Sequence, residues 1–462
     1  MITVFVRRVL PVIGMGAVMM VVATRMIISG TGADTYFHLR FGQEFLDGWS
    51  IRSPGHLSAF DSASWTPTQW LAQVGMAGVD DVFGLAGILW LAGTLTMALL
   101  VLVYLMARLR AAPLAAALAT AVFYVAAAPG LSARPQLLSY VFIAVATHAW
   151  LATVKDGRPR YWLVLLAWVW PTVHGMWPFG IMIAVVVLAG MALDRSVAPR
   201  ALLKLAVIPV ASLLLSAATP AGLGAFRSLV DVSSRSDYFA EWGAPDFTSP
   251  SSFVLALMLA VVFLVALVRP LPTTWADALM IGMATAWALF TVRTGPAAAI
   301  VAAPFLASAI QTFLPSQGPP ARREVITVLA LAAVSSTVLA LSAGSRTSEP
   351  VVPAWLDARL DAVPTGTRVL NEWDSGPYFL WRHPQLSLVM HGYGDVFTDD
   401  EIQRNADLVQ LNRGWDDDVA DLEADYALVT ADSRLGYALV HQLGWTVLEG
   451  DDEFELLSPS EK

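Results

Sequence analysis

Long apolar stretches recur about eleven times in this 462-residue chain, and they constrain the fold more than any other feature. Most have roughly 17 to 22 residues, enough for a helix rising about 1.5 Å per residue to cross about 30 Å of hydrocarbon. The composition agrees, because 56% of the residues are hydrophobic and only 14% are charged. We therefore expect a polytopic α-helical membrane protein with about 11 transmembrane helices. The stretches lie near residues 9–29, 85–107, 112–128, 136–154, 161–177, 178–193, 201–218, 251–269, 273–292, 294–314 and 324–343.

Lys and Arg are unevenly distributed between the segments that join these stretches. If the N-terminus is inside, the short cytoplasmic segments hold most of the bases, whereas the longer opposite loops hold fewer. Because Lys and Arg bias loops towards the cytoplasm, we expect a multi-pass protein of the cell (inner) membrane with a cytoplasmic N-terminus and an extracytoplasmic C-terminus. The cytoplasmic bases would be Arg7, Arg8, Arg108, Arg110, Lys155, Arg158, Arg160, Arg195, Arg200, Lys204, Arg269, Arg322 and Arg323.

Function is expected on the outer side, where residues 30–84, 219–250 and the tail form the long segments. We expect a transmembrane domain over 1–345, with 30–84 as its first outer loop, and a small extracytoplasmic α/β domain over 346–462. Alternating apolar patterns in the tail predict strands and helices in turn. The expected strands are 367–373, 386–394, 426–432 and 445–450, and the expected helices are 399–412 and 435–444.

Charge and composition exclude several classes of function. From Arg346 onwards the chain holds 23 acids against 8 bases, which disfavours nucleic acid as a partner. There is no cysteine, so disulfides and thiolate chemistry are impossible. Neither a GxGxxG nor a P-loop spacing occurs, so no nucleotide site is predicted.

Polar side chains at the predicted outer ends of the spans are the most informative residues. An ionisable group at the centre of a membrane helix costs about 2.5 to 3.5 kcal/mol, so one beside a span is expected to face a partner or a polar cavity. Each has an ordinary alternative, because an Arg can reach the headgroups and a His can be buried between helices. Together, acid, base and imidazole on one predicted side indicate a shared wet pocket. The residues are Asp34, Arg134, Gln136, His174, Trp177, Glu241, Trp242 and Arg293.

The first loop begins with a possible helix over residues 34–47. In such a helix Asp34 and His38 share a face, while Arg40 and Glu44 can pair. Asp34 could also simply cap the helix. A carboxylate near an imidazole or an arginine stays ionised and can accept a proton, as a general base must. Arg and His side chains suit an anionic phosphate.

The order of these motifs resembles the GT-C class of membrane glycosyltransferases. An opening span is followed by "DTYFHLRFGQEFLDG" at 34–48 and by "TQWLAQ" at 68–73. Further along come "RPQLLSY" at 134–140, "WPTVHG" at 170–175 and "AEW" at 240–242, which are similar to motifs of a broad bacterial group of GT-C-like proteins. The tail adds a strand-like "NEWDSGPYFLW" at 371–381 and "MHGYGDVFTDDE" at 390–401.

The resemblance implies a polyprenyl-phosphate donor whose lipid lies among the helices and whose sugar lies on the outer face. An acid of the first outer loop is the base in this class, and Asp34 takes that place here. Many members have two adjacent acids there, whereas this chain has one. The implied partners are a polyprenyl-phosphate-linked sugar, membrane lipid, and a glycan, lipid or protein acceptor. No cofactor or metal site is evident, and a divalent metal would be held by Glu241 with Asp34.

The implied reaction is an inverting sugar transfer to a cell-envelope acceptor. Arg293 and Arg134 would bind the phosphate, with His174 or His38 as hydrogen-bond donors. Five tail residues could bind an acceptor or could simply hold turns together: Glu372, Trp373, Asp374, His391 and Asp395. A transporter or flippase, with Asp277 as its proton-coupling acid, and a non-catalytic binder of a lipid-linked glycan are the alternative functions.

Overall fold

The computed structural model describes residues 9–234, 238–269, 273–315, 318, 320–344 and 352–460, which form two compact units. The first unit comprises Met1–Thr31 and Val82–Thr347, and the second comprises Gly32–Asp81 and Ser348–Lys462. The predicted domain boundary between 345 and 346, like Arg7 and Arg8, lies outside the described residues. Most of the first outer loop, which we expected to belong to the membrane domain, groups with the tail: residues 32–81 lie in the second unit.

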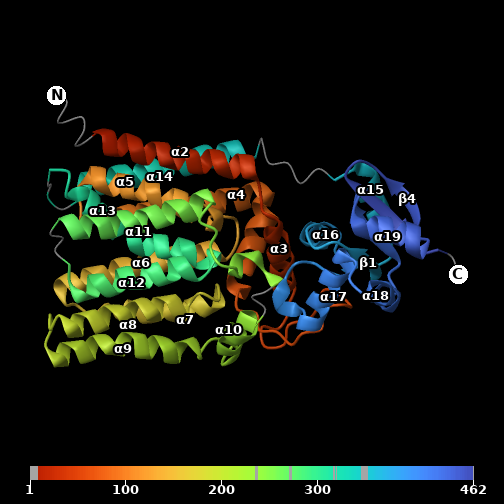
Figure 1. Cartoon of the computed structure of the whole chain (residues 1–462), viewed down its shortest axis with the longest axis horizontal. Coiled ribbons are helices and arrows are strands. Elements are labelled where there is room, and N and C mark those ends of the chain that lie inside the picture. The colour runs from red at the N-terminus through yellow and green to blue at the C-terminus, as the bar shows by residue number, and fades with distance from the viewer. Residues whose placement is uncertain are drawn as a thin grey trace. The chain divides into compact units, whose positions relative to one another are not determined.

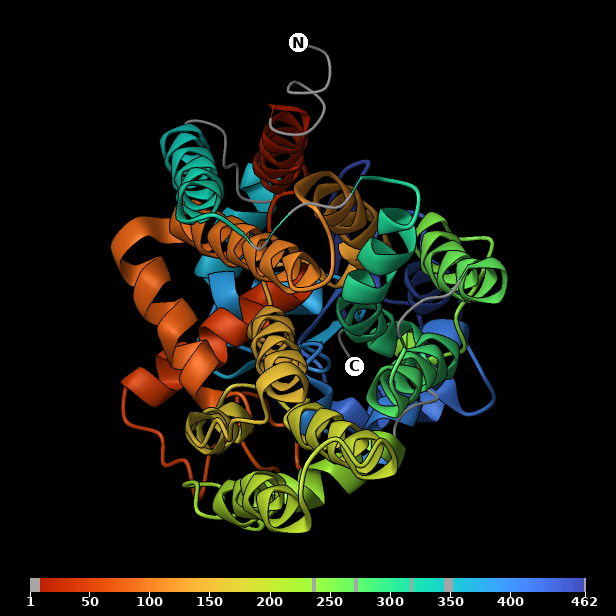
Figure 2. The ribbon, with the colours of Figure 1, turned by 90° about the vertical axis from the view of Figure 1, so that its left-hand side faces the viewer.

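The first unit is a bundle of apolar helices (Figures 1 and 2). Among the described residues, eight helices are long and apolar enough to cross a membrane, and three shorter apolar helices match the remaining expected stretches. The polytopic membrane fold is thus confirmed. The helices are α2 (Leu10–Ser29), α4 (Trp70–Arg108), α5 (Pro113–Ala127), α6 (Gln136–Asp156), α7 (Trp162–Val169), α8 (Pro178–Leu193), α9 (Pro199–Ser216), α10 (Gly224–Ser234), α11 (Pro250–Val268), α12 (Trp275–Phe290), α13 (Gly295–Gln311) and α14 (Arg322–Ala343).

Small residues and prolines explain much of this packing. Proline stands in the first turn of α5, α8, α9 and α11, where its fixed φ favours a helix start. Every residue of α13 from Gly295 to Ala307 is buried, because its alanines let neighbouring helices approach closely. Gly84, with φ of 61°, separates the first turns of α4 from its apolar part. The expected span near 85–107 begins at this break.

The second unit holds α3 (Ala33–Leu46), the start of α4 and a five-stranded sheet of order β2-β1-β3-β5-β4. Strand β1 is parallel to β2 and β3, whereas β5 is antiparallel to β3 and β4. The predicted α/β tail is confirmed. Its elements are α15 (Ala354–Asp361), β1 (Thr367–Asn371), α16 (Gly376–Arg382), β2 (Leu386–Leu388), α17 (Asp399–Gln410), α18 (Trp415–Leu422), β3 (Tyr426–Thr430), α19 (Arg434–Leu443), β4 (Thr446–Gly450) and β5 (Phe454–Ser458).

One segment of the tail differs from the expectation. The segment "GPYFLW", expected as part of a strand-like motif, is the helix α16. Strand β1 ends at Asn371, whose buried amide donates to the Met390 carbonyl at 2.6 Å and accepts from the Met390 N–H at 3.1 Å. Pro377 then stands in the first turn of the helix and favours its start.

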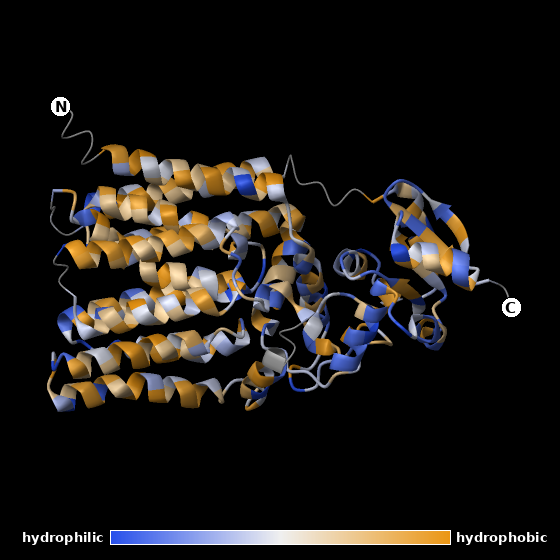
Figure 3. Cartoon of the chain, in the orientation of Figure 1, coloured by the Kyte–Doolittle hydropathy of each residue, from blue (hydrophilic) through white to orange (hydrophobic). Residues whose placement is uncertain are grey.

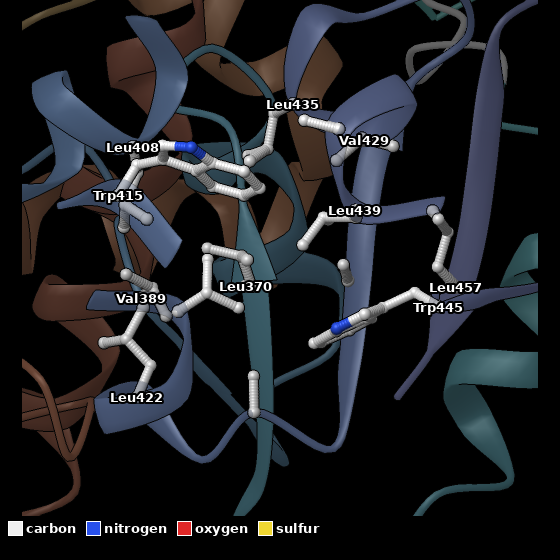
Figure 4. Close-up of a cluster of buried hydrophobic side chains, with 14 residues drawn as sticks. Leu370, Val389, Leu408, Trp415, Leu422, Val429, Leu435, Leu439, Trp445 and Leu457 are labelled. Carbon is white, nitrogen blue, oxygen red and sulfur yellow. The ribbon is translucent and has the colours of Figure 1, made fainter. Parts of the chain in front are cut away.

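Apolar side chains form the core of this tail between the sheet and its helices (Figure 4). Leu370 of β1 and Val429 of β3 meet Leu439 of α19 and Trp415 of α18 there. Coloured by hydropathy, the helices of the first unit are largely hydrophobic, whereas the second unit holds many hydrophilic residues (Figure 3).

The first loop packs onto the tail within the second unit. Phe37 of α3 stacks on Tyr393 with ring centroids 5.0 Å apart. Asp61, whose side chain is fully buried, lies 2.9 Å from His391 Nε2 and also accepts from the backbone N–H groups of Leu57 and Ser58. Such contacts between distant parts of the sequence explain why residues 32–81 group with the tail.

Candidate functional site

Five of the predicted site residues converge in the first unit, and we call them the rim cluster: Arg134, His174, Glu241, Trp242 and Arg293. Arg293 donates from Nη1 to Glu241 Oε1, and Arg134 Nη1 lies 3.7 Å from Glu241 Oε2. The Nη2 atom of Arg293 lies 3.3 Å from His174 Nε2. The Arg293 guanidinium carbon is 5.1 Å from the centre of the Trp242 ring. Residues spread over 160 positions therefore meet at one place.

Short 3₁₀ turns at the helix ends hold this cluster together. Arg293 lies in η6 (Val292–Thr294), which a reciprocal Thr291–Thr294 capping box fixes directly before α13. Glu241 and Trp242 lie in η5 (Ala240–Trp242), and the Gly243 carbonyl accepts from the Val292 N–H at 3.1 Å. This backbone bond brings the two turns together. Arg134 stands just before α6, and its Nε donates to Ser132 Oγ at 2.9 Å.

Two guanidinium groups of the cluster, those of Arg134 and Arg293, contact the carboxylate of Glu241. The side chains of Arg134, Glu241 and Arg293 are 25%, 29% and 21% exposed, so solvent or a ligand can reach them. Ion pairs this exposed contribute little to stability, about 0 to 1 kcal/mol. The planar N–H donors of two guanidinium groups match the geometry of a phosphate group.

His174 is held by a contact that the sequence did not reveal. Its Nδ1 lies 3.2 Å from Ser139 Oγ, and the indole Nε1 of Trp170 donates to the same Ser139 Oγ at 2.7 Å. His174 itself is only 2% exposed. Ser139 lies three residues after Gln136 on α6 and so on the same face of that helix. This spacing from a predicted site residue is the sequence signal that could have identified Ser139.

Gln136 and Trp177 lie beside the cluster in the sequence but make other contacts. Gln136 is buried and donates to the hydroxyl of Tyr140. Trp177 is 2% exposed and packs edge-on against Phe226 of α10, with ring centroids 4.9 Å apart. Their assignment to substrate binding stays a prediction.

Asp34, His38 and Arg40 lie together on α3 in the second unit. The helix begins at Ala33 with Gly32 as its N-cap residue, so the half-buried Asp34 lies in the first turn and is not the cap. His38 is buried, with Nδ1 3.1 Å from Gln73 Nε2. Arg40 pairs with Glu44 at 2.5 Å, as its spacing predicted. A single pocket that combines these residues with the rim cluster stays a prediction.

The predicted acceptor residues of the tail differ in their surroundings. Glu372 accepts from the Thr430 N–H at 2.9 Å and from its hydroxyl at 2.7 Å, and His391 is fully buried against Asp61. Asp374 is exposed, whereas Trp373 and Asp395 are half-buried. Burial, together with the negative charge of Asp395, raises the pKa of nearby Tyr393 well above its ordinary value. Tyr393 therefore stays neutral.

In the part of the chain that the structure describes, no group of three or more His, Asp or Glu side chains lies close enough to hold a metal ion.

The fold matches solved structures, although neither a protein-family model nor a curated protein matches the sequence. The apo oligosaccharyltransferase of Archaeoglobus fulgidus has a TM-score of 0.61 at 12% identity, covering 91% of this chain and 69% of its own. The same organism's AglB, in complex with an inhibitory peptide and a dolichol-phosphate, has a TM-score of 0.57 at 13% identity, with 97% and 74% covered.

A third solved structure extends the likeness over almost the whole of both chains. ArnT from Cupriavidus metallidurans, bound to undecaprenyl phosphate, has a TM-score of 0.52 at 15% identity, with 96% of this chain and 97% of ArnT covered. The chain thus has the fold of the GT-C membrane glycosyltransferases, as its motifs predicted.

Proposed function

We propose that this protein is a membrane glycosyltransferase that transfers a sugar from a polyprenyl-phosphate donor to a cell-envelope acceptor on the outer face of the membrane. The observation that carries the proposal is the rim cluster, in which two arginines and a histidine meet at the helix ends of a GT-C fold. AglB and ArnT bind dolichol-phosphate and undecaprenyl phosphate in their structures, which supports a donor of this class.

In the proposed reaction the rim cluster binds the donor phosphate. Arg293 and Arg134 stabilise the charge that develops on the phosphate as it leaves, and His174 donates a hydrogen bond to it. Asp34 takes the proton from the acceptor hydroxyl while that oxygen attacks the anomeric carbon. The bond from that carbon to the phosphate oxygen breaks, and polyprenyl phosphate leaves with the electron pair. Attack opposite the leaving group inverts the anomeric centre.

Charge at the two ends of the bundle supports the proposed sidedness. The rim cluster lies where α6 and α13 begin. At the opposite helix ends lie many of the predicted cytoplasmic bases, such as Arg108 at the end of α4 and Lys155 at the end of α6. By the positive-inside rule, this distribution supports an extracytoplasmic position for the cluster. Asp374, Trp373 and Asp395 are the tail residues that we propose for the acceptor.

The transport alternative depended on Asp277, and its surroundings argue against it. Asp277 is buried, closes a capping box with Thr274 at the start of α12 and pairs with Arg110. A carboxylate with these partners acts as a structural cap and lies at a helix end rather than at mid-membrane.

The decisive experiment is sugar release from polyprenyl-phosphate donors by the purified protein. Asp34→Asn should lower turnover by about 10²- to 10⁴-fold, the usual contribution of a general base, while undecaprenyl phosphate still binds. Asp47→Asn, at the exposed end of the same helix, is the matched control and should retain turnover. Donor binding without any sugar release by the wild type would favour a non-catalytic binder, and turnover by Asp34→Asn would exclude Asp34 as the base.

A further inference from the structure

We infer that Glu241 is an internal competitor of the donor phosphate. Its carboxylate occupies the guanidinium groups of Arg134 and Arg293 while the site is empty, and it is displaced when a phosphate binds there. The inference rests on the proposed function, because that function assigns the phosphate to these two arginines. What holds the carboxylate in place differs from what holds the arginines.

The carboxylate of Glu241 is held by charged partners alone. Its Oε1 accepts from Arg293 Nη1, and its Oε2 lies 3.7 Å from Arg134 Nη1. Among the residues that the structure describes, no backbone N–H, hydroxyl or side-chain amide donates to either oxygen. The side chain is 29% exposed, and a glutamate side chain is flexible, so it can turn into solvent without a change in the backbone.

The two arginines have supports that do not involve Glu241. Arg293 lies in the turn η6, which a capping box fixes, and its guanidinium group lies over the ring of Trp242. Arg134 donates from Nε to Ser132 Oγ at 2.9 Å. Both guanidinium groups can therefore stay in place when the carboxylate leaves.

Buried ion pairs elsewhere in this chain are built differently. Asp277, which pairs with Arg110, also accepts from a backbone N–H at the start of α12 at 3.3 Å. Glu324, which pairs with Arg108, also accepts from a tyrosine hydroxyl at 2.6 Å. In both pairs an uncharged donor keeps the carboxylate in place, whereas Glu241 has no such donor among the described residues.

A phosphate and this carboxylate cannot share the two arginines. Both are anions that accept from the same guanidinium N–H groups, and like charges at contact distance repel each other. A phosphate monoester such as the product, polyprenyl phosphate, carries a charge of about −1.5 to −2 at neutral pH. The phosphate of the donor is esterified on both sides and carries a single negative charge. The returning carboxylate therefore repels the product more than the donor, which promotes product release.

Binding of undecaprenyl phosphate to the purified full-length protein tests the competition. Glu241→Gln removes the charge and keeps the shape of the side chain. We expect it to bind this ligand about three- to tenfold more tightly than the wild type, because an exposed ion pair no longer has to be broken first. Inorganic phosphate should show the same gain, because the competition concerns the headgroup. Equal or weaker binding of either ligand by Glu241→Gln would overturn the inference.

The matched control is Asp156→Asn, which removes the same charge from another exposed pair of a carboxylate with an arginine. Asp156 pairs with Arg160 at 3.0 Å and lies at the end of α6 opposite to the rim cluster. This variant should bind undecaprenyl phosphate like the wild type. An equal gain in Asp156→Asn would show a general effect of net charge and would contradict the competition.

The displacement itself can be followed by solid-state NMR of the protein in lipid bilayers. The protein is labelled with ¹³C in its glutamate carboxyl groups and with ¹⁵N in its arginine guanidinium groups, and Glu241→Gln identifies the signal. We expect the contact between Glu241 and Arg293 in the empty protein and its loss once undecaprenyl phosphate is bound. A contact that persists with the ligand bound would disprove displacement.

Neither measurement requires turnover, so failure of the inference and failure of the proposed function are distinguishable. Sugar release by the wild type supports the glycosyltransferase whether or not Glu241 is displaced. Without sugar release, the competition between Glu241 and inorganic phosphate can still be measured.

Discussion

At the scale of single residues, Arg293 is the centre of the proposed phosphate site, since it contacts Glu241, His174 and Trp242. Lysine keeps the charge but loses the planar fork. We expect Arg293→Lys to weaken undecaprenyl phosphate binding by about tenfold or more, because hydrogen bonds to charged groups contribute about 1.5 to 3 kcal/mol. Binding can be measured by titration calorimetry. The control is Arg269→Lys, at the end of α11 and away from the rim cluster, which should bind undecaprenyl phosphate like the wild type.

Asp61 shows how one residue can hold the first loop to the tail. Its buried carboxylate faces His391 and accepts from the N–H groups of Leu57 and Ser58. Asp61→Asn removes the charge that these donors stabilise, so we expect the free energy of unfolding of the second unit to fall by about 2 to 4 kcal/mol. Thermal unfolding followed through the tail's tryptophans would show this, and a melting temperature equal to that of Asp47→Asn would contradict it.

At the scale of elements, α8 and α12 touch so closely that only glycine fits between them. A Cβ atom on Gly190 would lie 2.2 Å from the Ala276 Cα atom, whereas a Cβ on Gly282 of α12 would meet nothing within 4 Å. Gly190→Ala must push the two helices apart, at a cost of about 1 to 3 kcal/mol.

A comparison of Gly190→Ala with Gly282→Ala tests this prediction. Both changes add one methyl group to a helix of the same bundle. Gly282→Ala should leave stability unchanged or raise it slightly, because alanine favours helices. Melting temperatures in detergent should fall for the first variant only; equal values would mean that α8 and α12 are not in close contact.

At the scale of the whole molecule, the proposed orientation can be tested because the chain has no cysteine. Single cysteines then report sidedness without background labelling. We expect a membrane-impermeant maleimide to label Asp374→Cys on intact cells and to leave Ala198→Cys, in the exposed turn before α9, unlabelled until the cells are broken. The opposite pattern would invert the topology and place the rim cluster in the cytoplasm.

The sequence by itself determined the helical bundle and the α/β tail, because both follow from local regularities. Apolar stretches of sufficient length become helices wherever they meet lipid, and the expected stretch near 136–154 is the helix α6. The cost of charge near hydrocarbon was enough to single out Arg134, Glu241 and Arg293, which the structure brings together.

Only the tertiary structure decided which of these residues touch. Glu241 bridges two arginines, one more than 100 positions before it, and Ser139 joins Trp170 to His174. The grouping of residues 32–81 with the tail, through contacts such as Asp61 with His391, is equally invisible in the sequence. Periodicity reports which face of a helix is apolar, whereas the partner of a polar atom depends on how several helices and turns pack at once.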